Sequence, residues 1–128
     1  MGEAILQNLA KKWGWDMRVA SAGLYASPGS PLSENAREVL LEVFGIRDFY
    51  HGAQPMTQVL FDWSDLVIGM TEGHARLLTE RFGVYDKIVS MPVDVGDPWG
   101  GDFETYEACA LRIVDGIKIL KERGLLHE

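Results

Sequence analysis

A single thiol and two histidines are the first side chains to weigh as nucleophiles, bases or metal ligands. Cys109 falls on the apolar stripe of the expected last helix, and this position favours a buried structural thiol. His51 and His74 have no partner at metal-ligand spacing, so both are interpreted as structural or surface histidines. One cysteine excludes an internal disulfide, which fits a reducing compartment.

Three carboxylates stand in or next to the glycine-rich loop MPVDVGDPWGG. Asp94, Asp97 and Asp102 have the residue type of a cation site, but no EF-hand pattern flanks them, and we expect them to be solvated. We therefore expect no metal and no other cofactor. Read by itself, Asp97 is a turn residue, because Asp-Pro and Gly-Gly favour turns.

The elements that must position these residues alternate between helix and strand. Apolar spacing and capping residues predict helices over residues 4–13, 34–44, 58–61, 72–82 and 103–122, the middle three capped by Ser33, Thr57 and Thr71. Short β-compatible runs predict strands over residues 17–21, 65–70 and 87–91. Strands separated by helices indicate one α/β domain, residues 1–128, with a parallel sheet covered on both faces. Three strands are few for such a sheet, and none precedes the first helix.

Composition narrows the function classes. The chain has 128 residues, 47% of them hydrophobic, and a formal net charge of −7. This charge argues against a nucleic-acid-binding module, which needs clustered Lys and Arg. No apolar run approaches the ~20 residues that span a bilayer, so no membrane association is expected. The first residues do not read as a signal peptide, and the cytoplasm is the expected location.

Four stretches, in order, resemble the low-molecular-weight protein-tyrosine phosphatase family, including its bacterial protein-arginine phosphatase branch. They are MGEAILQNLAKKWG, RVASAGLYASPGSPLSENAREVL, HGAQPMTQVLFDWSDLVIGMTEGHARLL and GDPWGGDFETYEACALRI. The resemblance covers nearly the whole chain, and the ordered set SAG, SDLVIGM and DPWGG is far more specific than any one of them. It implies a three-layer α/β fold and hydrolysis of phosphotyrosine or phosphoarginine through a cysteinyl-phosphate intermediate.

The resemblance also implies roles for four residues. Asp97 would be the general acid that protonates the leaving group and then the base that activates water. Trp99 and Tyr25 would wall the substrate pocket, although ordinary packing is an equal alternative for each. Ser21 would lie beneath the phosphate loop and orient it, whereas a serine at a strand end is otherwise unremarkable.

The sequence departs from the family pattern at its beginning. The family starts with a strand and a C-x5-R-[ST] loop, which supply the nucleophile, the phosphate-binding Arg and the central strand of the sheet. Here Met1 corresponds to a position just after that loop, and the residue six positions after Cys109 is Asp115 rather than Arg. We therefore expect an N-terminally incomplete, truncated domain that lacks its first, central strand and is inactive alone.

Two functions of different class remain open, so whether this chain is an enzyme is uncertain. The first is a phosphoprotein phosphatase of which this chain is a shortened version, with SAGLYASPGSP and DPWGG leaning towards the arginine branch. The second is a non-catalytic interaction protein or one half of a split enzyme. It would bind a partner, or self-associate as a homo-oligomer, through the vacant strand position.

Overall fold

The computed structural model describes residues 1–23, 33–47, 54–93, 95, 96, 98 and 100–127. Its helices are α1 (Gly2–Lys12), α2 (Glu34–Phe44), α3 (Gln58–Trp63), α4 (Glu72–Phe82) and α5 (Phe103–Glu122). Its strands are β1 (Val67–Gly69) and β2 (Ile88–Ser90), which pair in parallel with Val67 opposite Ile88. The five predicted helices are confirmed, and so is the α/β class with a parallel sheet and helices on both faces.

Capping residues set the helix boundaries, as the sequence predicts. The side chains of Ser33, Thr57 and Thr71 each accept a hydrogen bond from the backbone N–H three residues on, at 3.1–3.2 Å. Helix α2 ends at Gly45, whose φ of 67° is left-handed and carries little strain in glycine. Each cap satisfies an amide or a carbonyl that the helix itself leaves without a partner.

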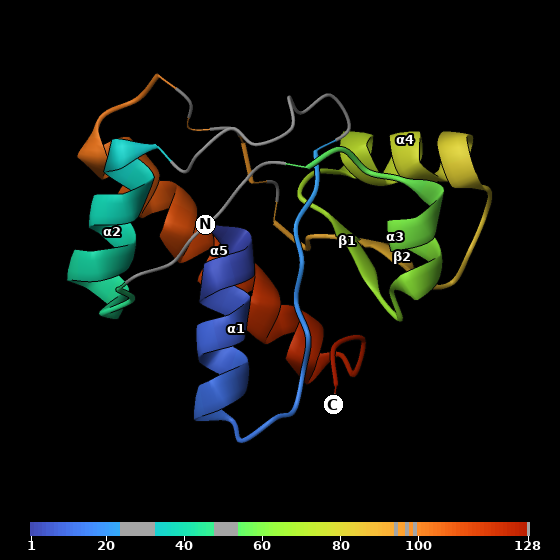
Figure 1. Ribbon diagram of the computed structural model, residues 1–128, viewed down its shortest axis with the longest axis horizontal. Helices are drawn as coiled ribbons and strands as arrows, with labels where there is room; N and C mark the ends of the chain where they lie inside the picture. The colour runs from blue at the N-terminus through green and yellow to red at the C-terminus, as the bar shows by residue number, and fades with distance from the viewer. Residues whose placement is uncertain (24–32, 48–53, 94, 97, 99, 128) are drawn as a thin grey trace.

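The molecule has two halves joined along one extended segment (Figure 1). Helices α1, α2 and α5 pack on one another and form what we call the helical half. Strands β1 and β2 with α3 and α4 form the sheet half, in which α4 packs on both strands. Residues 15–23 run between the two halves as a nearly straight trace (Figure 1).

The buried core lies mostly in the helical half. Its most deeply buried members come from α1, α2 and α5: Ile5, Val39, Leu40, Ala110, Ile117 and Leu120. In the sheet half Phe61 is 1% exposed and stacks on Phe82, with ring centroids 4.5 Å apart. There β1 also approaches α4 so closely that a Cβ added at Gly69 would lie 2.7 Å from the Ala75 nitrogen.

The predicted strand over residues 17–21 is wrong, and the other two strands are shorter than predicted. Residues 17–21 belong to no ladder, and only Gly23 forms an isolated parallel bridge, to Pro55. A strand is defined by its pairing, and β-compatible residues alone do not supply a neighbour. The described residues therefore form a sheet of two strands rather than three.

Candidate functional site

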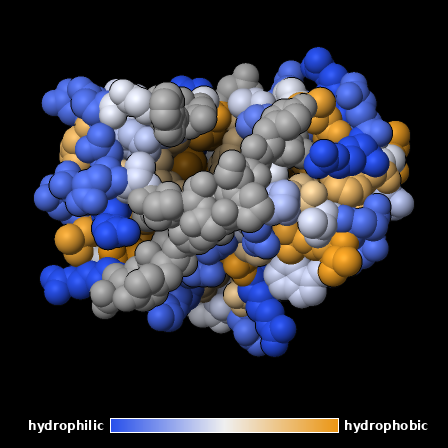
Figure 2. Space-filling model, turned by 45° about the horizontal axis from the view of Figure 1, so that its top comes forward, coloured by the Kyte–Doolittle hydropathy of each residue, from blue (hydrophilic) through white to orange (hydrophobic). Residues whose placement is uncertain are grey.

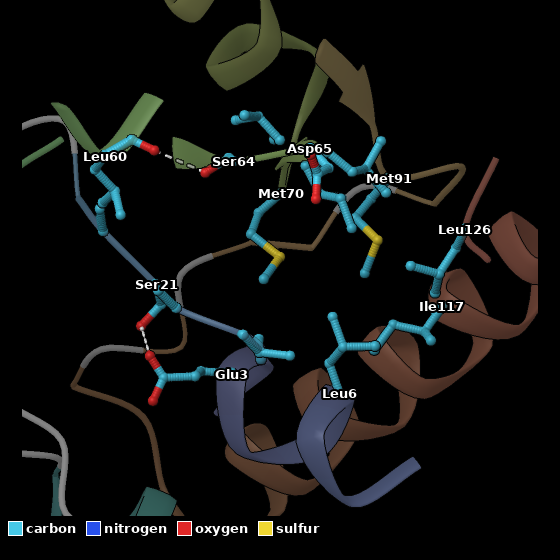
Figure 3. A pocket seen from close by; sticks show the side chains of 18 of the residues that line it. Glu3, Leu6, Ser21, Leu60, Ser64, Asp65, Met70, Met91, Ile117 and Leu126 are labelled. Carbon is cyan, nitrogen blue, oxygen red and sulfur yellow. Dashed lines mark hydrogen bonds between the residues drawn. The ribbon is translucent and has the colours of Figure 1, made fainter. Parts of the chain in front are cut away.

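A groove separates the extended segment from β1. It has a volume of about 830 Å³ and is lined by two unbroken runs of residues, 16–23 and 63–70. Figure 3 shows its two sides: α1 and α5 contribute Leu6 and Ile117, and the opposite wall comes from the sheet half. In the space-filling view, apolar residues gather in a hollow of the face shown (Figure 2). We call this cavity the strand groove.

Backbone groups face the strand groove from β1. Val67 N–H donates to the Lys87 carbonyl and the Gly69 carbonyl accepts from Met91 N–H, both at 2.8 Å, so alternate residues of β1 point towards β2. The N–H and C=O groups of Leu66 and Ile68 therefore point to the other edge, which borders the groove. Among the described residues, none supplies a backbone partner on that edge.

The extended segment presents a matching edge. Gly23 N–H donates to the Gln54 carbonyl at 2.9 Å, and the Gly23 carbonyl accepts from Met56 N–H at 3.0 Å. The Ser21 carbonyl accepts from the Gln54 side chain at 3.0 Å on the same side. By alternation, the N–H and C=O groups of Ala20 and Ala22 face the groove.

Side chains of α1 hold the extended segment in place. Ser21 Oγ donates to Glu3 Oε1 at 3.1 Å, and Gln7 Nε2 donates to the Val19 carbonyl at 3.3 Å. Helix α1 therefore runs opposite in direction to the segment, and its first turn lies at the segment's C-terminal end. The sequence singled out Ser21 but gave no sign of Glu3 and Gln7, because their contacts span 18 and 12 residues.

Three of the four predicted site residues, Asp97, Trp99 and Tyr25, lie outside the described residues, as do His51 and Asp94. The fourth, Ser21, is half-buried at the wall of the strand groove. His74 also lines the groove from the first turn of α4, which its spacing in the sequence did not indicate.

Cys109 and Asp102 have structural surroundings. Cys109 is buried in α5, where its thiol donates to the Gly96 carbonyl at 3.6 Å. Asp102 is the N-cap of α5 and accepts from the Thr105 hydroxyl at 2.7 Å and from the Thr105 N–H at 2.9 Å, and these bonds lower the pKa of its carboxyl group. Within the described ranges, no three His, Cys, Asp or Glu side chains group as metal ligands would.

The α-amino group of Met1 lies near Cys109 and Glu3. Burial lowers its pKa below the ordinary value of 8.0, while the charges of Cys109 and Glu3 act in the opposite direction. The start of α1 is half-buried, at the end of the groove where the Ser21–Glu3 hydrogen bond lies.

Comparison with known proteins decides the family. The sequence profile described as "Low molecular weight phosphotyrosine protein phosphatase" matches residues 1–124. The chain belongs to the low-molecular-weight phosphotyrosine protein phosphatase family. Among curated members of this family, a protein-arginine-phosphatase of Bacillus subtilis is 33% identical over 115 residues, which cover 84% of this chain and 75% of the relative.

Other members of the low-molecular-weight phosphatase family are similar to a comparable extent. A low-molecular-weight protein-tyrosine-phosphatase, PtpB, of Staphylococcus haemolyticus is 30% identical over 112 residues, covering 80% of this chain and 76% of the relative. The crystal structure of a low-molecular-weight protein tyrosine phosphatase from T. tengcongensis superposes with a TM-score of 0.84 at 30% identity, covering 95% of this chain and 88% of that one. These relatives include both tyrosine and arginine phosphatases.

The described part of this family member has no helix that is both long and apolar enough to cross a membrane. The 128 residues contain one cysteine, and the position six residues after it is Asp115, so the pattern C-x5-R does not occur in them.

Proposed function

We propose that this chain is the scaffold of a cytoplasmic, cysteine-dependent phosphoprotein phosphatase and that the 128 residues alone do not catalyse turnover. The family match over residues 1–124 carries the first part. The second part is supported by the surroundings of Cys109, which is buried in α5 without an Arg six positions on. A phosphatase nucleophile must be an accessible thiolate held near positive charge.

The proposed reaction has two steps. A thiolate from a C-x5-R loop attacks phosphorus, the bond to the leaving group breaks, and Asp97 donates a proton to the leaving atom. Asp97 then takes a proton from water, which attacks the cysteinyl phosphate and releases inorganic phosphate and the thiolate. In this proposal Trp99 and Tyr25 contact the substrate side chain, and Ser21 supports the loop from the wall of the groove.

We favour phosphoarginine over phosphotyrosine as the substrate. The SAGLYASPGSP and DPWGG motifs lean towards the arginine branch, and two arginine phosphatases are 33% and 34% identical to this chain. The tyrosine phosphatase of Staphylococcus haemolyticus is 30% identical, so the difference is small.

The test compares the chain alone with a fusion that adds a strand and a C-x5-R-[ST] loop before Met1. The chain alone should show no turnover above background on an aryl phosphate or on phosphoarginine. The fusion should be active, and Asp97→Ala in the fusion should lower kcat by about 10²–10⁴-fold. Turnover by the chain alone that Cys109→Ser abolishes would contradict the proposal, and so would a folded but inactive fusion.

A second candidate function is a non-catalytic interaction protein that binds a partner or a second copy through the strand groove. The two backbone edges that face the groove favour it. Sedimentation of the chain alone distinguishes binding of a partner from binding of a second copy. Self-association through the groove predicts a concentration-dependent dimer, and binding of a different partner does not.

A further inference from the structure

We propose that Asn35 of α2 is a positioning residue for general-acid catalysis, because its side chain anchors the loop that carries Asp97. The role rests on the proposed function, in which Asp97 is the acid, and adds a residue that takes no part in the chemistry itself. Three features support it: a hydrogen bond between distant segments, the close fit of Gly101 in the loop, and further anchors on the other side of Asp97.

The Asn35 side chain bonds to the end of the loop. Asn35 stands in the first turn of α2, and its Nδ2 donates to the Gly101 carbonyl at 3.0 Å across 66 residues of sequence. A carbonyl oxygen only accepts hydrogen bonds, so the contact needs the amide nitrogen, and an aspartate of the same shape cannot make it. Helix α2 and the start of α5 lie side by side and pack on each other (Figure 1). The bond therefore joins the loop to a helix that is itself part of the core.

Gly101 fits closely against its neighbours. Its N–H donates to the Pro98 carbonyl at 2.8 Å, which closes a turn that ends at Gly101. A Cβ added at Gly101 would lie 2.7 Å from Cγ2 of Thr105 and 2.9 Å from the Pro98 carbonyl oxygen, so an alanine there has to displace the turn. Gly101 is thus in contact with α2 through Asn35 and with α5 through Thr105.

The loop is also anchored before Asp97. Val95 is 5% exposed, and its N–H donates to the Met70 carbonyl at 3.0 Å, just after β1. The Gly96 carbonyl accepts from the Cys109 thiol of α5 at 3.6 Å. Anchors on both sides of a short segment reduce the number of conformations that the segment can adopt.

The contribution of Asn35 should depend on the leaving group. A general acid must lie within hydrogen-bond reach of the leaving atom, and a displacement of about 1 Å can cost about 10²-fold in rate. Protonation matters most for a leaving group that is a poor anion and least for one that departs as a stable anion. Loss of the anchor should therefore slow cleavage of phenyl phosphate far more than cleavage of dinitrophenyl phosphate. A general loss of folded protein would slow both alike.

The test measures kcat/KM on both aryl phosphates in the fusion that adds a strand and a C-x5-R-[ST] loop before Met1. Asn35→Ala removes the amide, Asn35→Asp keeps its shape without the donor, and Asn35→Gln keeps the donor on a longer side chain. Gly101→Ala displaces the same loop without touching α2. Glu38→Gln, at an exposed position of α2, is the matched control. Urea denaturation of each variant measures its folding.

We expect Asn35→Ala and Asn35→Asp to lower kcat/KM about tenfold for phenyl phosphate and less than about twofold for dinitrophenyl phosphate. Asn35→Gln should recover part of the loss, and Glu38→Gln should change neither value. Gly101→Ala should favour the better leaving group in the same way. In an Asp97→Ala background, Asn35→Ala should have no further effect, because the group that it positions is absent.

The anchor can also be measured in the 128-residue chain without any activity. Asn35→Ala should lower the NMR order parameters of the Gly100 and Gly101 amides, which report motion on the ps–ns timescale. The order parameters of the amides in the middle of α2 should not change. Unchanged values at both glycines would overturn the proposal.

Three kinetic results would also overturn it. These are equal losses on the two aryl phosphates, an Asn35→Asp variant as active as the unsubstituted fusion, and a full further loss when Asn35→Ala is added to Asp97→Ala. If Asn35→Ala fails to fold, Asn35→Asp and Gly101→Ala carry the same comparison. An unsubstituted fusion that cleaves neither substrate overturns the proposed function and this role together. An active fusion whose variants do not discriminate between leaving groups overturns the role of Asn35 alone.

Discussion

The helical half and the sheet half bury their apolar residues to different extents. In the helical half Ile5, Val39 and Leu40 are at most 1% exposed. In the sheet half all three residues of β2 and two of the three in β1 are only half-buried, and Trp63 is 47% exposed. A parallel strand is normally buried on both faces and paired on both edges. The difference shows that the helical half packs as a finished core, whereas the sheet half borders the strand groove along one edge.

The largest expected difference between the two halves is in the free energy of unfolding that is lost when an apolar side chain is truncated. We expect Leu40→Ala to lower the free energy of unfolding by about 3 kcal/mol, because it leaves a cavity in a closed core. Ile68→Ala should cost only about 1 kcal/mol, since the half-buried Ile68 side chain borders the groove. Urea denaturation of both variants measures the difference. Equal losses would mean that the two halves are equally well packed.

The stability of the sheet half should depend more on a single polar side chain than the stability of the helical half does. Lys87 Nζ donates to the carbonyls of Phe61 and Ser64 at 2.6 and 2.9 Å and lies 4.1 Å from the Phe61 ring centroid. It therefore joins the residue just before β2 to α3 and its C-cap. Lys87→Met should lower the free energy of unfolding by about 2 kcal/mol. Lys118→Met, at an exposed position of α5, is the control and should change it by less than about 0.5 kcal/mol. If the Lys87→Met variant is as stable as this control, the Lys87 hydrogen bonds do not stabilise the sheet half.

Removal of a helix cap should show which half unfolds as a unit. Ser33→Ala in α2 and Thr71→Ala in α4 each lose one cap bond of 3.2 Å and should each cost about 1 kcal/mol. In hydrogen exchange, Ser33→Ala should accelerate amides throughout the helical half. Thr71→Ala should accelerate mainly those of α4, because local opening is easier where fewer residues are buried. The reverse pattern would contradict the assignment of the core to the helical half.

The smallest expected effect is on pH dependence. The Met1 amine has a lowered pKa in the folded chain, so the unfolded chain binds more protons between that lowered value and 8.0. The free energy of unfolding should therefore rise with pH through this window and level off above 8.0. An N-acetylated chain lacks this group, and the difference between the two chains isolates it from histidine titration. A constant difference across the window would show that the amine is not buried.

The sequence predicted the parts of the fold that local chemistry controls. Ser33, Thr57, Thr71 and Gly45 mark helix ends because caps act within a few residues of the chain. The same local argument failed for residues 17–21, which have strand-like side chains but no paired strand among the described residues. Strand formation depends on a partner that local sequence cannot supply.

The candidate site was less predictable than the helices. The expected roles of Asp97, Trp99 and Tyr25 remain predictions, because these residues lie outside the described part of the chain. The sequence grouped Asp102 with two other carboxylates of the glycine-rich loop. In the structure its hydrogen bonds to Thr105 make it the cap of a helix. The strand groove itself had no local signature, since its two main runs of residues, 16–23 and 63–70, lie at least 40 positions apart in the sequence.

Because Cys109 is buried, the rate at which its thiol is alkylated measures how often the structure around it opens. An alkylating reagent needs an accessible thiolate, and in the folded chain the thiol is enclosed in α5 against the Gly96 carbonyl. The rate of labelling therefore reports how often α5 separates from the rest of the helical half. Since Cys109 is the single cysteine, each labelled molecule records one such event at a known site.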